Sequence, residues 1–156
     1  MKFNRIAIFL SFLLIATAGF AQNLKPLKGI SILLDPGHGG ADPGAVGPTG
    51  LKESDVNLRV ARYLRDLLQA DGAEVKMTRD KDVALSLADR VAMAEKLSPD
   101  LFVSIHHNAS LKPITDNRSE IYYNAIERGI SQKVGNNMMY ELAKWGFGEE
   151  SIILPA

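Results

Sequence analysis

Two histidines lie directly after apolar segments that have the composition of buried strands. His38 follows residues 30–34 within the sequence Asp-Pro-Gly-His-Gly-Gly, and His106 follows residues 101–105. Histidines at the ends of strands are a common way to build a metal site into a sheet. A hydrolytic zinc site takes three ligands from histidine and carboxylate side chains and leaves a fourth position for water. We therefore expect an acidic residue beside the two histidines.

The acid that would complete such a site is ambiguous from spacing alone. Asp35, Asp42 and Glu53 each lie close enough in the chain to reach His38. The chain has no cysteine, which excludes disulfides, thiolate zinc sites and a cysteine nucleophile. Any metal must therefore be held by histidine and carboxylate side chains.

The strands and loop that must position these residues follow from hydrophobic patterning. Residues 30–34 and 101–105 are continuous apolar runs typical of strands buried on both faces, and residues 73–78 predict another strand. Glycine and proline recur through residues 35–50 at a density that neither a helix nor a strand tolerates, which predicts a long loop. Loops of this length in compact domains are usually functional.

Two amphipathic helices are expected between the strands. The first begins at Glu53 and ends near Gly72, with apolar positions at Val56, Val60, Leu64, Leu67 and Leu68 and polar positions at Arg59, Arg62, Asp66 and Gln69. The second opens at Ser86, where Asp89 three residues later gives a capping pattern, and Pro99 ends it. Its apolar positions are Leu87, Val91, Ala94 and Leu97.

This order of elements predicts an α/β fold, in which a twisted, mostly parallel sheet is flanked by helices in three layers. Short helical crossovers connect parallel neighbours with right-handed geometry, so the carboxyl ends of the three strands share one edge. Open α/β sheets place their ligands at that edge. His38 and His106 should therefore lie close together.

The C-terminal part continues the pattern less clearly. Residues 119–123 predict a strand, and an amphipathic helix closed by Gly146 is indicated by Val134, Met138, Leu142 and Trp145. Residues 152–156 are apolar and look like the approach to another element. We therefore expect a C-terminal strand or helix of the domain to be missing from this chain.

Composition restricts the classes of protein. The chain has 156 residues, 46% of them hydrophobic and 23% charged, which is typical of one globular domain rather than a disordered protein. Basic and acidic residues both number 18, so the net charge of zero gives no reason to expect a nucleic acid partner.

The N-terminus predicts export. Lys2 and Arg5 precede an uncharged run over residues 6–22, and small residues before Ala21 suggest that a signal peptide of residues 1–21 is cleaved there. The run is shorter than the roughly 20 residues that a membrane span needs, so no stable membrane anchor is expected after cleavage. The predicted location is the periplasm or cell envelope, and removing Lys2 and Arg5 leaves 16 basic residues against 18 acidic.

Several motifs in order resemble one family, the zinc-dependent N-acetylmuramoyl-L-alanine amidases of bacterial cell walls. The resemblance spans residues 30 to at least 123. It is carried by residues 33–40, 44–45, 50–53 and 104–109, together with Arg79, Arg90 and Glu120 before Tyr122 and Tyr123. It implies that residues 22–156 are an amidase catalytic domain, truncated at its C-terminus, whose substrate is peptidoglycan. The implied reaction is hydrolysis of the amide bond between N-acetylmuramic acid and L-alanine.

The resemblance also implies roles for particular residues. It assigns zinc to His38, Glu53 and His106, and so selects Glu53 where spacing could not. Asp35 and Asn108 would lie outside the ligands, orienting imidazoles or loop backbone. His107 should point to the opposite side of the strand from His106 and is not expected to bind the metal. Arg79 and Arg90 have the simpler interpretation that they tie loops to the sheet.

The general base of such amidases is a glutamate near the C-terminus, which the resemblance places beyond Ala156. Glu149 and Glu150 do not fit, because they precede the last apolar stretch instead of following it. The alternative to an active amidase is a non-catalytic peptidoglycan-binding or regulatory module with the same fold. Whether a protein activator exists is left open by the sequence. The glycine-rich loop lacks the lysine and hydroxyl ending of a phosphate-binding loop.

Overall fold

A computed structural model of the chain describes residues 25–108, 120–123, 128–145 and 152–155. The chain divides into two compact units, Met1–Ala109 and Ser110–Ala156, and each is described by itself. The predicted signal peptide of residues 1–21, the capping residue Gly146 and the acids Glu149 and Glu150 lie outside the described residues.

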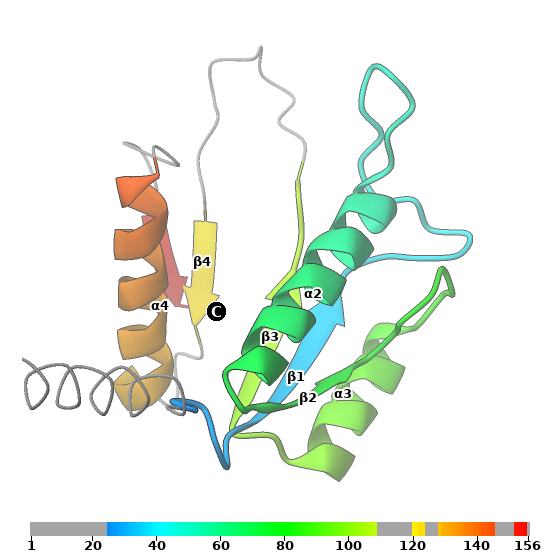
Figure 1. The fold of residues 1–156 in the computed structure, drawn as a ribbon. Coiled ribbons are helices and arrows are strands. Elements are labelled where there is room, and N and C mark those ends of the chain that lie inside the picture. The colour runs from blue at the N-terminus through cyan, green and yellow to red at the C-terminus, as the bar shows by residue number, and fades with distance from the viewer. Residues whose placement is uncertain (1–24, 109–119, 124–127, 146–151, 156) are drawn as a thin grey trace, which may run out of the picture. The chain divides into compact units, whose positions relative to one another are not determined.

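The first unit is built on a three-stranded parallel sheet (Figure 1). Its strands are β1 (Ser31–Pro36), β2 (Glu74–Met77) and β3 (Leu101–Ile105), in the order β2-β1-β3. Both neighbouring pairs are parallel. The strands predicted from the three apolar runs are therefore confirmed to within two residues, and so is their common direction. Their carboxyl ends meet at one edge, from which the loop after β1 leaves.

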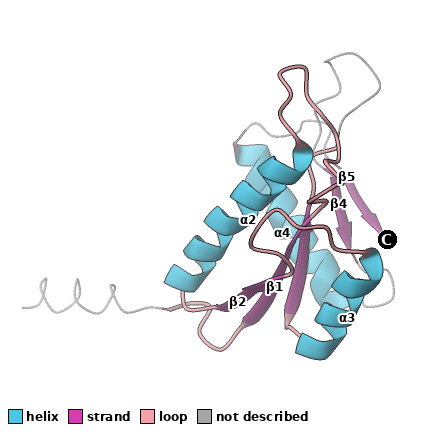
Figure 2. Cartoon of the chain, turned by 90° about the vertical axis from the view of Figure 1, so that its right-hand side faces the viewer, coloured by secondary structure: helices cyan, strands magenta, loops and turns pink. Residues whose placement is uncertain are grey.

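Helices α2 (Glu53–Ala70) and α3 (Leu87–Leu97) lie on opposite faces of this sheet (Figure 2). The first crossover runs from β1 to β2 and the second returns across β1 to β3, so right-handed connections place the two helices on opposite faces. The predicted capping box is present, because Ser86 accepts from the backbone of Asp89 and Asp89 accepts in return from the backbone of Ser86. The three layers follow from these connections.

Apolar side chains fill the half of the sheet that lies away from this edge. Ile32 and Leu34 of β1 cluster with Ala73 and Val75, and partly buried residues pack around them: Leu27, Leu64, Leu68, Met77, Leu101 and Val103. Leu64 and Leu68 were predicted on the apolar face of the helix, and this placement is confirmed.

The prediction for the rest of that helical face was wrong at two positions. Val60 and Leu67 are 40% and 49% exposed, whereas Leu58 and Ala61 are buried. The buried face of α2 begins with polar residues, because Glu53 and Asn57 turn inward near the end of β1. Periodicity that counts only apolar residues as inward therefore misses the polar part of the buried face.

The same kind of error affects α3. Leu87 and Val91, two of the apolar positions that indicated this helix, are 82% and 56% exposed, and the buried residue of the helix is Arg90. Arg90 reaches the end of β1, as described below. A buried charge again occupies the position that the hydrophobic pattern gave to an apolar side chain.

The second unit contains β4 (Glu120–Tyr123), α4 (Arg128–Lys144) and β5 (Ile152–Pro155). The strands pair in parallel, so the apolar C-terminal segment is itself a strand and not only the approach to one. A Cβ added at Gly135 of α4 would lie 3.2 Å from the Ile121 side chain, which explains a glycine within a helix. Met138 and Trp145, predicted on the apolar face of this helix, are exposed.

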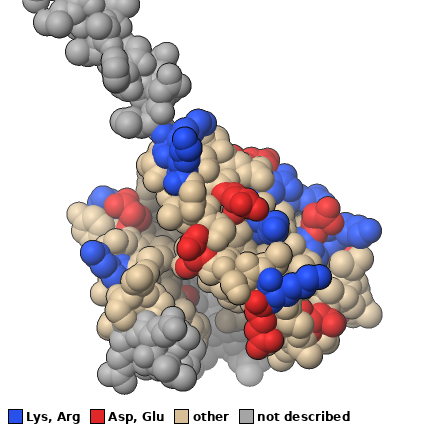
Figure 3. Space-filling model, turned by 90° about the horizontal axis from the view of Figure 1, so that it is seen from below, with Lys and Arg blue, Asp and Glu red and all other residues tan. Residues whose placement is uncertain are grey.

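Two surface properties complete the description. Acidic and basic side chains occur side by side on the face seen in Figure 3. Among the helices of the described residues, we find none with the length and apolar character needed to cross a membrane.

Candidate metal centre

The loop after β1 brings His38 to the carboxyl edge of the sheet. Gly37 donates its backbone N–H to the carbonyl of Ile105, which ties the start of the loop to the end of β3. A Cβ at Gly37 would lie only 2.2 Å from the His106 ring, so glycine is required for the ring to pack there. His38 itself has a φ of 60°, a backbone conformation that few residues other than glycine adopt.

Three side chains from three segments converge at this edge. His38 Nε2 lies 3.2 Å from Glu53 Oε1, and His106 Nδ1 lies 3.0 Å from the same oxygen. The two imidazole rings are 4.9 Å apart between centroids and nearly perpendicular. One ligand atom from each of the three residues lies within 4.8 Å of the others. The proximity of His38 and His106 that the topology predicts is thus confirmed.

The donor set fits a zinc ion. Ligand atoms at about 2.0–2.1 Å from a tetrahedral zinc lie roughly 3.4 Å apart. The distances from Glu53 Oε1 to the two imidazole nitrogens, 3.2 and 3.0 Å, are close to this value. The Glu53 side chain is 3% exposed, while those of His38 and His106 are 24% and 40% exposed. The group is therefore closed on the protein side by Glu53 and open to solvent on the side of the imidazoles, as a catalytic rather than a structural metal site requires.

Glu53 is held as a carboxylate by its surroundings. Burial would by itself raise the pKa of Glu53. Backbone N–H groups of Ala45 and His107 donate to the carboxylate, and with the hydrogen bonds to the His106 and Asn57 side chains they lower its pKa to about 2. The backbone N–H of Glu53 donates in return to the Ala45 carbonyl, which closes the glycine-rich loop against the start of α2. The negative charge is thus fixed before any cation binds.

Asp42 takes a different position from the other two candidate acids. Its Oδ2 lies 2.8 Å from His38 Nδ1, and its Oδ1 accepts from the backbone of Gly44. The hydrogen bond to His38 lowers the pKa of Asp42. A carboxylate on Nδ1 places the ring hydrogen there and leaves the Nε2 lone pair facing Glu53. Spacing named Asp42 as a neighbour of His38, and the structure places it on the ring nitrogen away from Glu53.

Comparison with known proteins gives the fold a family. A sequence model described as N-acetylmuramoyl-L-alanine amidase matches residues 32–145, most of the chain. The chain belongs to the N-acetylmuramoyl-L-alanine amidase family. The family that the ordered motifs resemble is therefore confirmed, and so is the predicted α/β fold.

Individual relatives agree with this assignment. The chain is 46% identical over 103 residues to the amidase AmiC of Neisseria meningitidis serogroup B, which covers 62% of this chain and 25% of that protein. The catalytic domain of the amidase CwlV from Bacillus (Paenibacillus) polymyxa var. colistinus is 34% identical, with a TM-score of 0.71 over 81% of this chain and 70% of that one. The CwlD amidase of Clostridioides difficile, solved in complex with the GerS lipoprotein, is 26% identical, with a TM-score of 0.75 over 82% and 73%. The chain thus spans about a quarter of the AmiC sequence that it matches.

Asp35 does not contact an imidazole in this amidase fold. It is buried, accepts from the Thr78 hydroxyl at 2.6 Å and from the Ser104 hydroxyl at 2.9 Å, and forms an ion pair with Arg90. Arg90 in turn donates to the carbonyls of Pro36 and His38. Of the two roles expected for Asp35, only the orientation of loop backbone has a structural basis, and it acts through Arg90.

Arg79 fixes the same loop. Its guanidinium is buried and donates to the carbonyls of Pro36, Gly37 and Ser54. These bonds join the end of β1 to the first turn of α2. The interpretation that Arg79 and Arg90 tie loops to the sheet is therefore confirmed.

Sequence reasoning missed Asn57, which is fully buried on α2. Its side chain bonds to Gly37, Glu53 and His107. The signal that could have found it is its place four residues after Glu53, because residues four apart share one face of a helix. His107 lies against Asn57 and outside the group of His38, Glu53 and His106. Asn108 is exposed, and its predicted role remains a prediction.

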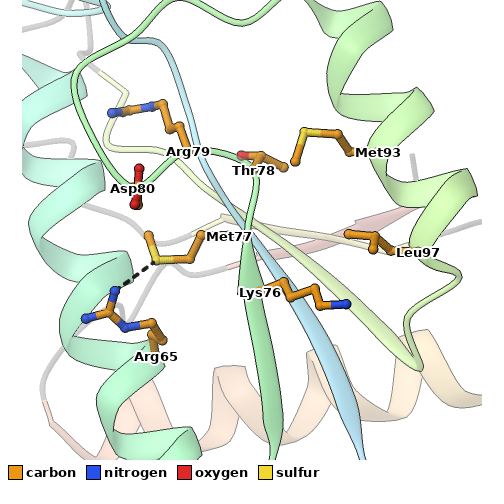
Figure 4. Close-up of a pocket in the computed structure, with 8 residues that line it drawn as sticks. All are labelled: Arg65, Lys76, Met77, Thr78, Arg79, Asp80, Met93 and Leu97. Carbon is orange, nitrogen blue, oxygen red and sulfur yellow. Dashed lines mark hydrogen bonds between the residues drawn. The ribbon is translucent and has the colours of Figure 1, made fainter.

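A separate cavity lies beside the edge strand β2 (Figure 4). Its volume is about 340 Å³, and its lining residues are Arg65, Lys76, Met77, Thr78, Arg79, Asp80, Met93 and Leu97. Figure 4 shows the Arg65 guanidinium against the Met77 sulfur, a contact of 3.8 Å. None of the three converging side chains lines this cavity, so the chemistry of the amidase site is not assigned to it.

Proposed function

We propose that this chain is the catalytic domain of a zinc-dependent amidase, with His38, Glu53 and His106 as the metal ligands. Its substrate would be peptidoglycan, and the bond cleaved would be the amide between N-acetylmuramic acid and L-alanine. The observation that carries the proposal is the convergence of one carboxylate and two imidazoles at the sheet edge of an amidase-family fold.

Zinc bound here would supply a Lewis acid that polarises the amide carbonyl and lowers the pKa of water. The protein prepares the site in two ways. Glu53 provides a buried negative charge that is already hydrogen-bonded in place. Asp42 keeps the hydrogen of His38 on Nδ1, so that Nε2 is free to bind a cation. The general base remains the glutamate predicted from the family resemblance.

The location proposed for this activity is the periplasm or cell envelope, where peptidoglycan lies. It depends on the predicted signal peptide of residues 1–21, which would leave residues 22–156 as the mature part of this chain. Sequencing the N-terminus of the exported protein tests this directly. A mature protein that still begins at Met1 would contradict it.

Metal content tests the ligand assignment. We expect one zinc per chain in the purified protein and a loss of most bound zinc in His38→Ala and in His106→Ala. Gln69→Ala, an exposed change near the end of α2, is the matched control and should keep its zinc. Equal zinc content in all four proteins would refute the assignment.

Activity tests the substrate. In a protein that includes the predicted general-base glutamate, a muropeptide that carries a stem peptide should be split into a glycan with a free lactyl carboxylate and a peptide with a free L-alanine amine, which mass spectrometry distinguishes from glycan cleavage. The reaction should stop when the metal is chelated and in both histidine variants. If the protein that includes this glutamate binds zinc and sediments with peptidoglycan but releases no peptide, the non-catalytic alternative is favoured.

A further inference from the structure

We propose that Asn57 is the positioning residue of this metal site, a buried amide that holds the three ligand-bearing segments in one arrangement. The inference rests on the proposed metal site and adds to it a residue that neither spacing nor the motifs assigned. It predicts that metal affinity depends on a side chain that does not itself bind the metal.

Asn57 contacts all three segments. Its Nδ2 donates to the carbonyl of Gly37, the residue before His38, at 3.2 Å, and to Glu53 Oε1 at 3.4 Å. Its Oδ1 lies 2.7 Å from Nδ1 of His107, the residue after His106. One side chain thereby joins the end of β1, the first turn of α2 and the segment that follows β3.

The partners of the amide fix its orientation. A carbonyl oxygen and a carboxylate oxygen can only accept, so the NH₂ group of Asn57 must face Gly37 and Glu53. Oδ1 then faces His107, whose Nδ1 must carry the hydrogen. The backbone N–H of His107 donates to Glu53 Oε1 at 3.0 Å, which closes a ring of hydrogen bonds through Asn57, Glu53 and His107.

This ring explains why the residue is asparagine. Aspartate would accept from His107 but could not donate to Gly37, and it would place a second negative charge beside Glu53. Alanine would leave the Gly37 carbonyl and His107 Nδ1 without this partner. Asn57 and Gly37 are both buried, so solvent does not readily replace the amide at the Gly37 carbonyl.

A purely structural role for Asn57 makes a different prediction. A buried amide that only stabilises the fold would lower the free energy of unfolding when removed and leave the metal affinity of the folded protein unchanged. A positioning role requires that affinity itself falls, because Glu53 and the segments of His38 and His106 lose their common restraint. Removal of residues that orient metal ligands typically weakens metal affinity by about 10–100-fold.

The test is the zinc dissociation constant, measured by competition with a chromophoric chelator under conditions where each zinc-free variant is folded. Asn57→Ala should bind zinc about 10–100-fold more weakly than the wild type. Leu58→Ala is the matched control, because Leu58 is the next buried residue of α2 and none of the hydrogen bonds at the site involves its side chain. It should lower the melting temperature and leave the zinc affinity unchanged.

A second variant keeps the proposal testable if Asn57→Ala does not fold. His107→Ala removes one bond of the ring at an exposed side chain and should also weaken zinc binding, by less than Asn57→Ala. In the zinc-free wild type, the ¹⁵N chemical shifts of the His107 ring should show a hydrogen on Nδ1, and this signature should be lost when Asn57 is replaced.

The outcomes separate this inference from the proposed function. A wild-type chain that binds no zinc would overturn the proposed function and this inference with it. A wild-type chain that binds zinc, with Asn57→Ala and His107→Ala binding it as tightly, would overturn the positioning role alone. Weakened binding in both variants, with Leu58→Ala unaffected, would establish it.

Discussion

The two ends of the three-stranded sheet are buried to a similar degree by opposite kinds of side chain. Away from the carboxyl edge, Ile32 and Leu34 of β1 pack with other apolar residues. At the carboxyl edge, the next residue of the strand is Asp35, which is 4% exposed and surrounded by polar groups. The change from one kind of burial to the other takes a single step along β1.

The two kinds of burial should differ in how well they tolerate amino-acid substitutions. Burial of apolar surface is non-directional, so a core tolerates a substitution that keeps the approximate volume. Burial of polar groups requires a partner for each one. Among the described residues, no buried side-chain nitrogen or oxygen lacks a hydrogen-bond partner. Replacing one polar side chain at the carboxyl edge therefore removes a hydrogen-bond partner from several others. The resulting loss in the free energy of unfolding should exceed that of a comparable change in the apolar half.

Asp35→Ala should give the largest effect. The change leaves Arg90, whose side chain is 8% exposed, as a buried charge without its carboxylate. Breaking a buried ion pair in this way costs about 3–5 kcal/mol. Urea unfolding of the metal-free protein measures the loss. The double variant Asp35→Leu with Arg90→Met should recover much of it, because no buried charge remains, and a double variant as unstable as the single one would contradict this account.

Acidification should remove the next largest contribution, that of Glu53. Its pKa of about 2 in the folded protein lies below the ordinary value of 4.5. The ionised carboxylate therefore stabilises the fold fully above about pH 4.5, and this stabilisation is lost as the pH falls toward 2. The difference corresponds to about 3 kcal/mol. The free energy of unfolding of the metal-free protein, measured from pH 6 downward, should fall less steeply in Glu53→Gln, and equal slopes would exclude the effect.

Thr78→Val should have an intermediate effect. The two side chains have nearly the same shape, so the change removes the hydroxyl that donates to Asp35 at 2.6 Å and little else. A hydrogen bond to a charged group contributes about 1.5–3 kcal/mol. Thermal and urea unfolding should both show the loss. If Thr78→Val is as stable as the wild type, the polar end of the sheet does not depend on each of its bonds.

The same contrast explains what the sequence could predict. The strands, the long loop and the capped helix at Ser86 were predicted nearly to the residue, because apolar runs, glycine and proline density and a capping box are local patterns. The convergence of His38 and His106 also followed, since the direction of parallel strands is set by their short crossovers.

The polar end could not be predicted in the same way. Its partners are far apart in the chain: Arg90 meets Asp35, and Asn57 meets His107. Hydrophobic periodicity counts only apolar residues toward the inward face of a helix, but Val60 and Leu87, which set that pattern, are exposed. Glu53 itself was chosen from among three acids by family resemblance. The structure shows that its place at the start of α2 lets the backbone of Ala45 and His107 hold its carboxylate.

Ile32→Val should give the smallest effect and sharpen the comparison most directly. It removes one methylene from the apolar half of β1, three residues before Asp35, and such changes cost about 0.5–1.5 kcal/mol. Thr78→Val likewise alters a single group, since it replaces one hydroxyl by a methyl group. The two variants therefore compare the loss of stability from a change of similar size at each end of the sheet. We expect the smaller loss of stability in Ile32→Val and no change in its zinc affinity, because the apolar half can repack without moving the ligands. A larger loss in Ile32→Val than in Thr78→Val would mean that close packing of the core, rather than the satisfied polar network, limits the stability of this fold.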